Sequence, residues 1–231
     1  METEKTKYRH ELKYLISSAQ IPLLKARISQ IMHSDPHAGS RGTYNIRSVY
    51  FDDYHNKCFF ENENGTDPRE KFRIRIYNHS AERISLECKE KNHGKTLKNS
   101  CPLTIDETRH LLERHPIPIQ GTEYPLIRKL TLQMHTRLLR PVVIVEYDRT
   151  PYVYQNGNVR ITFDSNICAS ACVKNFLTDS IPKRPVLPVG HALMEVKFDE
   201  YLPDFIYRSL NLGQLQQTTF SKYYLCRKFI D

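Results

Sequence analysis

Basic and apolar residues alternate along the segment 70–91, and this alternation constrains the fold more than any other feature of the sequence. In its first half, Lys71, Arg73 and Arg75 occupy one parity, while apolar residues occupy the other. Side chains of a strand point alternately to its two faces, so the three cations share a face. After a turn, the second half repeats the alternation and adds one carboxylate, Glu87, to the charged row. The segment therefore predicts a β-hairpin with one apolar face and one cationic face.

The same separation of charged and apolar residues recurs in the extended segments 9–13, 160–164 and 194–198. An ordinary hairpin points its charges toward water, but this recurrence favours several strands that close into a barrel around a charged lumen. Enclosed cations repel one another, so a mostly basic lumen requires a multiply charged anion. Because Arg and Lys both bind phosphate oxygens strongly, a chain of phosphates is the ligand that fits best.

The composition sets the number of domains and the class of partner. The chain has 231 residues and is 39% hydrophobic, which is enough apolar material for one sizeable core. We expect one domain over residues 1–231. There are 34 Lys and Arg residues against 26 Asp and Glu residues, so the formal net charge is +8. This charge favours polyanionic partners, but it does not choose between nucleic acid, membrane headgroups and polyphosphate.

The start of the chain and its cysteines indicate the compartment. Residues 1–7 are polar and lack the apolar run of a signal peptide. No segment approaches the roughly twenty apolar residues that span a bilayer, so we expect a soluble, cytoplasmic protein without a membrane span. The six cysteines include no Cys-x-x-Cys pair, and the spacing from Cys168 to Cys172 has no companion pair. Reduced thiols are therefore expected rather than a zinc site.

Periodicity and turn residues predict further strands along the chain. The all-apolar start of 141–150 indicates burial on both sides near one end, with Glu146 and Arg149 toward the mouth. Asn156-Gly157 predicts a hairpin turn, and 166–188 is expected to be irregular. The predicted strands cover 8–16, 45–51, 70–77, 83–91, 95–101, 141–150, 152–154, 159–163 and 191–198.

Capping signals and apolar stripes predict helices between these strands. Asp52-Asp53 is compatible with a cation site, but an aspartate after a strand more often caps a helix, and we favour the cap. Thr104 and Glu107 match a capping box. The predicted helices run from a cap at Ser17-Ser18 to Met32, over 54–64, from Thr104 onward, over 124–139 with Leu126, Leu130, Met134 and Leu138 as its stripe, over 203–210 and over 219–229.

Eight short motifs, in order along nearly the whole chain, resemble the VTC domain. This is the polyphosphate polymerase branch of the triphosphate tunnel metalloenzymes and is related to the CYTH proteins. Each motif alone is weak, and it is their shared order that is specific. The motifs are Arg9-x-Glu11-x-Lys13-Tyr14, Val49-Tyr50-Phe51-Asp52, Lys71-x-Arg73-x-Arg75-x-Tyr77, Leu86-Glu87-x-Lys89, Tyr147-x-Arg149, Arg160-x-Thr162-x-Asp164, Glu195-x-Lys197 and Ser221-Lys222-Tyr223.

The resemblance implies a single α+β polymerase domain, an eight-stranded antiparallel β-barrel tunnel that is open at both ends and has helices on its exterior. It implies transfer of the terminal phosphate of ATP to a growing inorganic polyphosphate chain, with Mn²⁺ or Mg²⁺ as the divalent cation. Glu195 matches the metal-binding glutamate of the family, and Lys98 is matched with Lys95 as a neighbouring candidate. The resemblance assigns Arg73, Arg75, Lys89, Arg149 and Arg160 to catalysis and Glu11, Lys13, Lys98, Ser221 and Lys222 to substrate binding.

One departure from the wider CYTH pattern bears on the reaction. Those hydrolases typically begin with Glu-x-Glu-x-Lys, whereas this chain has Arg9-x-Glu11-x-Lys13 and so has one carboxylate fewer. Fewer metal-binding acids and more cations favour holding a chain over activating a water. The resemblance covers neither the phosphate-sensing domain nor the membrane helices that some relatives attach, so the route by which a product would leave the cytosol stays open.

Two other functions are weighed against polymerisation. The first is hydrolysis of triphosphate or nucleoside triphosphate in the same tunnel, with water as the acceptor. The second is a non-catalytic polyanion or RNA-binding module, in which Tyr50, Tyr77 and Tyr147 stack on bases. Glu87, Glu146 and Glu195 within the basic strands would repel nucleic acid unless a metal ion is bound there, so ATP and polyphosphate are the expected partners and nucleic acid is not.

Overall fold

Eight strands follow one another in an antiparallel path in the order β1-β10-β8-β7-β3-β4-β5-β6. The structure is a computed structural model that describes residues 9–230. The predicted start of the first strand at Tyr8 lies outside the described residues. The α+β class and the eight-stranded antiparallel architecture are confirmed. The strands are β1 (His10–Ser17), β3 (Tyr44–Asp52), β4 (Arg69–Tyr77), β5 (Ser80–Asn92), β6 (Lys95–Leu103), β7 (Arg140–Tyr154), β8 (Val159–Ser170) and β10 (His191–Phe198), with short strands β2 (His33–Ser34) on β7 and β9 (Arg184–Pro185) on β8.

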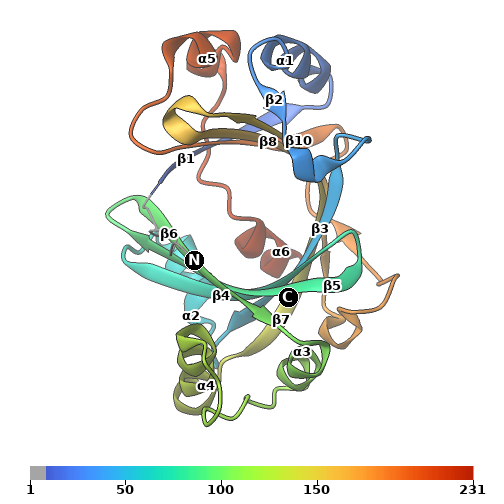
Figure 1. The fold of residues 1–231 in the computed structure, drawn as a ribbon, viewed down its shortest axis with the longest axis vertical. Helices are drawn as coiled ribbons and strands as arrows, with labels where there is room; N and C mark the ends of the chain where they lie inside the picture. The colour runs from blue at the N-terminus through green and yellow to red at the C-terminus, as the bar shows by residue number, and fades with distance from the viewer. Residues whose placement is uncertain (1–8, 231) are drawn as a thin grey trace.

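The two ends of this path meet and close a tunnel. The backbone N–H of Arg9 donates to the carbonyl of Thr96 at 3.1 Å, and the N–H of Thr96 donates to the carbonyl of Arg9 at 3.2 Å. This bridge joins the start of β1 to β6, so the first and last strands of the path lie beside each other. In Figure 1 the strands accordingly encircle a central opening, with β1, β8 and β10 above it and β4, β5 and β6 below it.

Alternation along each strand separates a lumen from an apolar exterior. On β4, Lys71, Arg73 and Arg75 line the central cavity, as the hairpin pattern predicts. Ile74 and Ile76 between them are fully buried on the outer face, where they belong to a core beneath the hairpin. The returning strand obeys the same rule, and the predicted cationic face of the hairpin is therefore the inner face of the tunnel.

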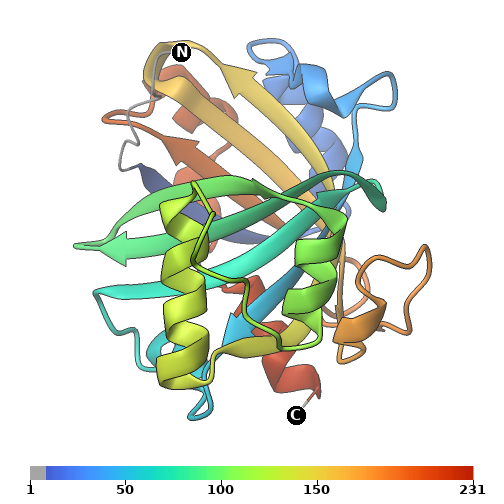
Figure 2. The same cartoon turned by 60° about the horizontal axis from the view of Figure 1, so that its bottom comes forward.

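Helices cover the two apolar outer surfaces. Helices α1 and α5 lie side by side over β1, β8 and β10 (Figure 1), and α3 and α4 lie against the outer face of the β4–β5–β6 hairpins (Figure 2). Within the described residues, no helix is long and apolar enough to cross a bilayer. The helices are α1 (Gln20–Ile28), α2 (Lys57–Glu63), α3 (Ile105–Leu112), α4 (Pro125–Arg137), α5 (Asp204–Ser209) and α6 (Lys222–Ile230).

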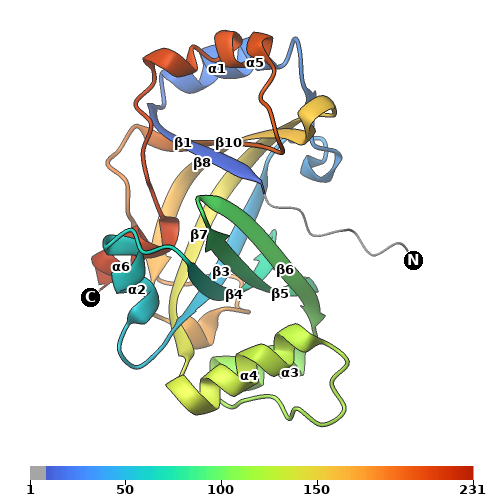
Figure 3. The same cartoon turned by 90° about the vertical axis from the view of Figure 1, so that its left-hand side faces the viewer.

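Helix α6 fills one end of the tunnel. Val143 and Val145 lie on the lumen parity of β7 and share a core with Tyr223 and Cys226 of α6. Between them, Ile144 faces the core beneath α3 and α4, so the predicted burial of this run on both sides is confirmed. Figure 3 shows α6 beside α2 at the left-hand end of the tunnel. The expectation of a tunnel open at both ends is therefore wrong for this conformation.

Several predicted element boundaries need correction. The runs 141–150 and 152–154 form one strand, β7, and β8 continues to Ser170 into the stretch that we expected to be irregular. The first helix ends at Ile28 instead of Met32, and Leu138 lies past the end of α4 with 60% of its surface exposed. A left-handed backbone at Leu138 (φ 53°) ends α4 and turns this side chain away from the predicted stripe.

Two of the three predicted helix caps are present, whereas the N-cap of α1 is Ala19, without a side-chain cap hydrogen bond, instead of the predicted Ser17-Ser18. Thr104 and Glu107 form the expected capping box at the start of α3. Helix α2 begins three residues later than predicted, but the Asp52 carboxylate accepts hydrogen bonds from the N–H groups of Cys58 and Phe59. Both oxygens of this buried carboxylate therefore satisfy backbone donors of the first turn, which supports a cap rather than a cation site.

Candidate functional site

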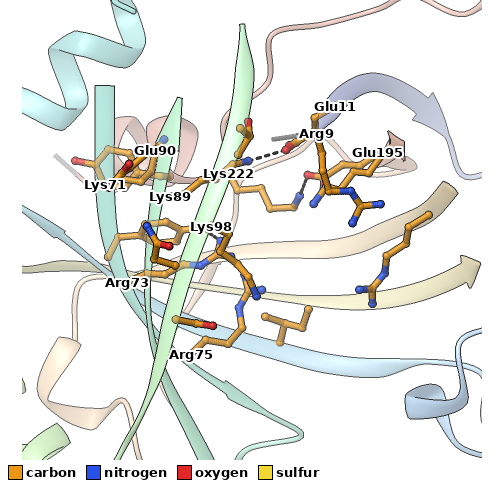
Figure 4. Close-up of a pocket in the computed structure, with 18 of the residues that line it drawn as sticks. Arg9, Glu11, Lys71, Arg73, Arg75, Lys89, Glu90, Lys98, Glu195 and Lys222 are labelled. Carbon is orange, nitrogen blue, oxygen red and sulfur yellow. Dashed lines mark hydrogen bonds and ion pairs between the residues drawn. The ribbon is translucent and has the colours of Figure 1, made fainter. Parts of the chain in front are cut away.

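A cavity of about 1000 Å³ occupies the tunnel, and its lining is strongly basic. Twelve Lys or Arg side chains and four Asp or Glu side chains line it among the described residues. Figure 4 shows many of these side chains converging on the lumen from opposite walls. The structure brings all eleven residues of the predicted site into this cavity: Glu11, Lys13, Arg73, Arg75, Lys89, Lys98, Arg149, Arg160, Glu195, Ser221 and Lys222.

The β4–β5 hairpin forms one wall around the buried carboxylate of Glu87. Arg73 donates to it through Nε at 2.7 Å, and the guanidinium of Arg75 lies 3.8 Å away. Burial opposes ionisation of Glu87, but the charges of Arg73, Arg75 and Lys98 outweigh it and hold the pKa of this carboxyl far below its usual range. Arg73 also donates to the Tyr50 hydroxyl at 2.9 Å, so this wall is rigid and cationic.

The opposite wall is built by β7, β8 and β10 together with the first residue of α6. Arg149 donates two hydrogen bonds of 2.7 Å to the two oxygens of Asp164. The Lys222 ammonium lies 2.7 Å from Asp164 and 2.6 Å from Glu195, and Lys197 lies 3.2 Å from Glu195. Burial would raise the pKa of Glu195, but these neighbouring cations, with Lys222 first, hold it well below its usual range.

Strand β1 connects the two walls. Glu11 lies 2.7 Å from the Lys89 ammonium and 3.2 Å from that of Lys13. Lys13 also donates to the carbonyl of Phe220 at 2.8 Å, just before α6. Burial lowers the pKa of Lys89 to about 8 even though the Glu11 carboxylate opposes that shift. The protonation of Lys89 therefore depends on its burial and on the charged groups around it.

Arg160 and Lys98 lie nearer to solvent. Arg160 donates to Asp35 at 2.8 Å and to the Tyr44 hydroxyl at 2.9 Å. Lys98 is 3.5 Å from Glu87 and half exposed, whereas the alternative candidate, Lys95, does not line the cavity. The structure thus favours Lys98 over Lys95 as the tunnel residue.

The prediction that Glu146 lies near the mouth is wrong. Residues three apart in a strand face opposite sides, so Glu146 faces outward when Arg149 faces the lumen. Glu146 is buried on the outer surface, where it accepts a hydrogen bond of 2.6 Å from Arg47 and pairs with Lys183. It has no part in the cavity lining.

Some cavity residues were absent from the predicted site. Lys71 and Lys197 line the cavity, and the charge alternation that revealed Arg73 and Glu195 marks both of them. Asp164 was part of a motif, but its place between Arg149 and Lys222 follows from strand pairing and could not be read from local sequence.

Two groups of side chains have the ligand types of a metal site. Glu195 and Asp164 converge on Lys222, and two adjacent carboxylates, of which Glu195 lines the cavity, suit Mg²⁺ or Mn²⁺, which take their other ligands from water and phosphate. The residues therefore fit such an ion. The second group, found within the described part of the chain, consists of Glu70, Cys88 and Glu90. Both of its carboxylates already pair with Lys129, whose ammonium lies 2.5 Å from Glu70 and 2.8 Å from Glu90.

Comparison with known proteins identifies a protein family and similar folds. A family model of the VTC domain matches residues 8–230. An adenylate cyclase-like protein from Bacillus halodurans has a TM-score of 0.51 at 16% identity, covering 90% of this chain and 88% of its own. HpAC1 from Hippeastrum, an adenylyl cyclase-like protein with a dominant triphosphatase activity, has a TM-score of 0.51 at 13% identity, covering 96% of each chain. No curated protein matches the sequence.

These identities relate the folds alone, whereas the family match concerns the sequence itself. It spans residues 8–230, and the eight motifs and the tunnel that they line fall within it. The chain therefore belongs to the VTC domain family and has a triphosphate tunnel fold.

Proposed function

We propose that this protein transfers the terminal phosphate of ATP to a growing inorganic polyphosphate chain held in the tunnel, in a reaction that depends on Mn²⁺ or Mg²⁺. The observation that carries this proposal is the state of four carboxylates in the tunnel wall, three of them buried. Each lies beside at least two cations, and the neighbouring cations outweigh burial and hold each pKa below its usual range. The four are Glu11, Glu87, Asp164 and Glu195.

Such carboxylates are poor bases. A general base works best when its pKa lies near the operating pH, and hydrolysis needs a group that takes a proton from water. A phosphate acceptor brings an oxygen that is already ionised, so no base is required. The set of lumen carboxylates therefore supports transfer to phosphate over transfer to water.

The basic side chains supply what phosphoryl transfer demands, which is in-line positioning and stabilisation of charge. In this proposal Arg73, Arg75, Lys89 and Arg149 bind the β- and γ-phosphates of ATP. Tyr50 and Ser48 hold two of these arginines in place before ligand binds, through hydrogen bonds of 2.9 Å from Arg73 and 3.1 Å from Arg75. Preorganised donors of this kind stabilise developing charge without reorganising during the reaction.

The acceptor phosphate would lie against Lys13, Arg160 and Lys222, with Glu11 orienting Lys13 and the Ser221 hydroxyl facing the neighbouring Lys71. Glu195, with Asp164 beside it, would hold the divalent cation. When bound, that ion neutralises charge on the phosphate oxygens. Lys222 and Arg149 partly neutralise the negative charge of these two carboxylates.

Triphosphate hydrolysis is the second candidate, because the Hippeastrum protein with this fold has a dominant triphosphatase activity. A water molecule would then replace the acceptor phosphate at the same arginines. The RNA-binding module has less support. Tyr50 and Tyr147 are buried, and their hydroxyls accept hydrogen bonds from Arg73 and Arg75, so neither ring is free to stack on a base.

The products of ATP turnover test the proposal. The purified protein is incubated with ATP and Mn²⁺, and the products are resolved on a gel that separates polyphosphate from orthophosphate. We expect chains that lengthen with time, no product without metal and none from Arg73→Ala. Orthophosphate as the sole product would contradict the polymerase and support the triphosphatase. Absence of both products would contradict both.

A further inference from the structure

Lys71 stands apart from the other lysines inside the tunnel. Lys13, Lys89, Lys197 and Lys222 each have a carboxylate oxygen within 3.2 Å. For Lys71, no carboxylate of the described residues lies within ion-pair distance. Its amine instead lies 3.0 Å from the Asn62 side-chain oxygen and 3.4 Å from the Ser221 hydroxyl.

The position of Lys71 is at the end of the tunnel that α6 fills. Asn62 belongs to α2, Ser221 immediately precedes α6, and the Lys71 amine lies 5.3 Å from the centre of the Tyr223 ring. Figure 4 shows Lys71 beside Lys89 on this side of the lumen. A phosphate chain that entered from the other end would reach Lys71 last.

The charges that face Lys71 do not favour an ammonium ion. Lys89 of β5, Lys13 of β1 and Arg69 of its own strand repel it, and the Cys58 thiol of α2 would attract it if ionised. Burial raises the pKa of that thiol, so it is neutral. Burial, followed by Lys89 and Lys13, lowers the pKa of Lys71 well below its usual value.

We propose that Lys71 is a proton-linked phosphate ligand, which is an uncharged amine in the empty tunnel and becomes an ammonium ion when the end of a phosphate chain arrives. This inference rests on the proposed binding of phosphate chains. The amine nitrogen gains one proton from solvent and no other bond changes. The phosphate oxygens supply the negative charge that the carboxylates supply to the other lysines. The Ser221 hydroxyl and Asn62 oxygen then hold the ammonium toward the chain.

Proton uptake on binding is the direct consequence. Calorimetric titration of tripolyphosphate without metal, in two buffers of different ionisation enthalpy, counts the protons taken up per ligand bound. At about pH 8.5, Lys71→Arg, which carries a permanent charge, should take up about one proton fewer than the wild type. Its Kd should accordingly change about tenfold less per pH unit. The protons that the ligand itself binds cancel in this difference.

Lys129→Arg is the matched control. Lys129 also lines the cavity and is already charged, since Glu70 and Glu90 overcome burial and raise its pKa, so this exchange should leave the proton count unchanged. Lys71→Met, which removes the amine and keeps much of its volume, should lose the same proton as Lys71→Arg and serves if the arginine variant does not fold. Equal proton uptake by the wild type and a folded Lys71 variant would overturn the role of Lys71 while leaving the proposed function standing. Failure of tripolyphosphate to bind the wild type would contradict the proposed function itself.

Discussion

Strand β7 contributes to two buried arginine–carboxylate pairs, one on each face of the sheet. Inside the tunnel, Arg149 holds both oxygens of Asp164 at 2.7 Å. On the outer surface, Glu146 accepts a hydrogen bond from Arg47 at 2.6 Å. The two pairs are alike in chemistry and in depth, since none of the four residues is more than 6% exposed.

The surroundings of the two arginines distinguish them. Three further donors of Arg47 bind the backbone carbonyls of Phe176, Thr178 and Asp179, so this guanidinium fastens a loop on the outer surface. Arg149 lines the cavity, where cations outnumber acids. A buried arginine held by three backbone carbonyls outside the cavity is structural, whereas one beside an excess of cations is available to an anion.

Breaking the outer pair should have the largest effect. Arg47→Met leaves Glu146 and three carbonyls short of their donor, and loss of one partner of a buried pair costs roughly 3–5 kcal/mol. Urea denaturation should show this loss of unfolding free energy, while the molecules that remain folded bind tripolyphosphate as the wild type does. A variant with wild-type stability would mean that the outer pair does not hold the loop.

Breaking the inner pair should affect turnover more than stability. Arg149→Met should reduce phosphate transfer about 10²- to 10³-fold, the usual effect of losing one charge-stabilising donor. Each carboxylate keeps a lysine, Asp164 at Lys222 and Glu146 at Lys183. Arg47→Met also deprives three backbone carbonyls of their donor, so the stability loss should be smaller for Arg149→Met. Initial rates of ATP consumption measure the first quantity and urea denaturation the second. Near-normal turnover would remove Arg149 from the proposed site.

Removing the charge of a carboxylate beside Arg149 should raise the Mn²⁺ concentration that activity requires, whereas the same change at Glu146 should not. Glu195→Gln keeps the shape of the side chain but loses its charge, so half-maximal activity should require at least about tenfold more Mn²⁺. ATP binding should weaken less. Rates are titrated against Mn²⁺ in the wild type, Glu195→Gln and the outer control Glu146→Gln. An unchanged metal response in Glu195→Gln would move the site to Glu11 or Glu87.

Acid should also weaken both pairs, with a smaller loss of unfolding free energy than the substitutions cause and gradually over a range of pH. Neighbouring cations outweigh burial and lower the pKa of Asp164 and of Glu146, so the unfolded chain binds their protons more readily than the folded chain does. Their stabilisation is complete above the unfolded pKa of about 4 and is lost as the pH falls below it. Urea denaturation from about pH 6 to pH 3 should give a shallower decline for Asp164→Asn and Glu146→Gln than for the wild type. Identical slopes would contradict these pairings.

The lining of the tunnel was predictable because a strand has a period of two. The alternation within each charged run identifies the face that points into the lumen, whichever strands pair with it. This holds for 9–13, 71–75, 160–164 and 194–198. The capping box at Thr104 was equally local. The eight-strand architecture came from the shared order of the motifs.

What the sequence did not reveal depends on contacts between distant residues. Glu146 has a partner 99 positions away in Arg47, and no local signal announces it. The apolar half of β7 indicated a cover on both sides, but only the assembled fold identifies that cover as α6 through Tyr223. Lys71 follows the same alternation as Arg73, and its lack of a carboxylate partner among residues 9–230 is a property of the finished lumen.

Selective binding of a bare phosphate chain is the most direct test of the tunnel as the functional site. Melting temperatures are measured without metal, with polyphosphate and with single-stranded RNA at equal phosphate charge and ionic strength. A ligand that binds the folded state alone raises the melting temperature with its free concentration above Kd. A closed lumen surrounds a phosphate chain but excludes sugars and bases, so polyphosphate should give the larger shift. An open basic groove follows phosphate charge and salt alone. Equal or larger shifts with RNA would contradict the tunnel as a polyphosphate site.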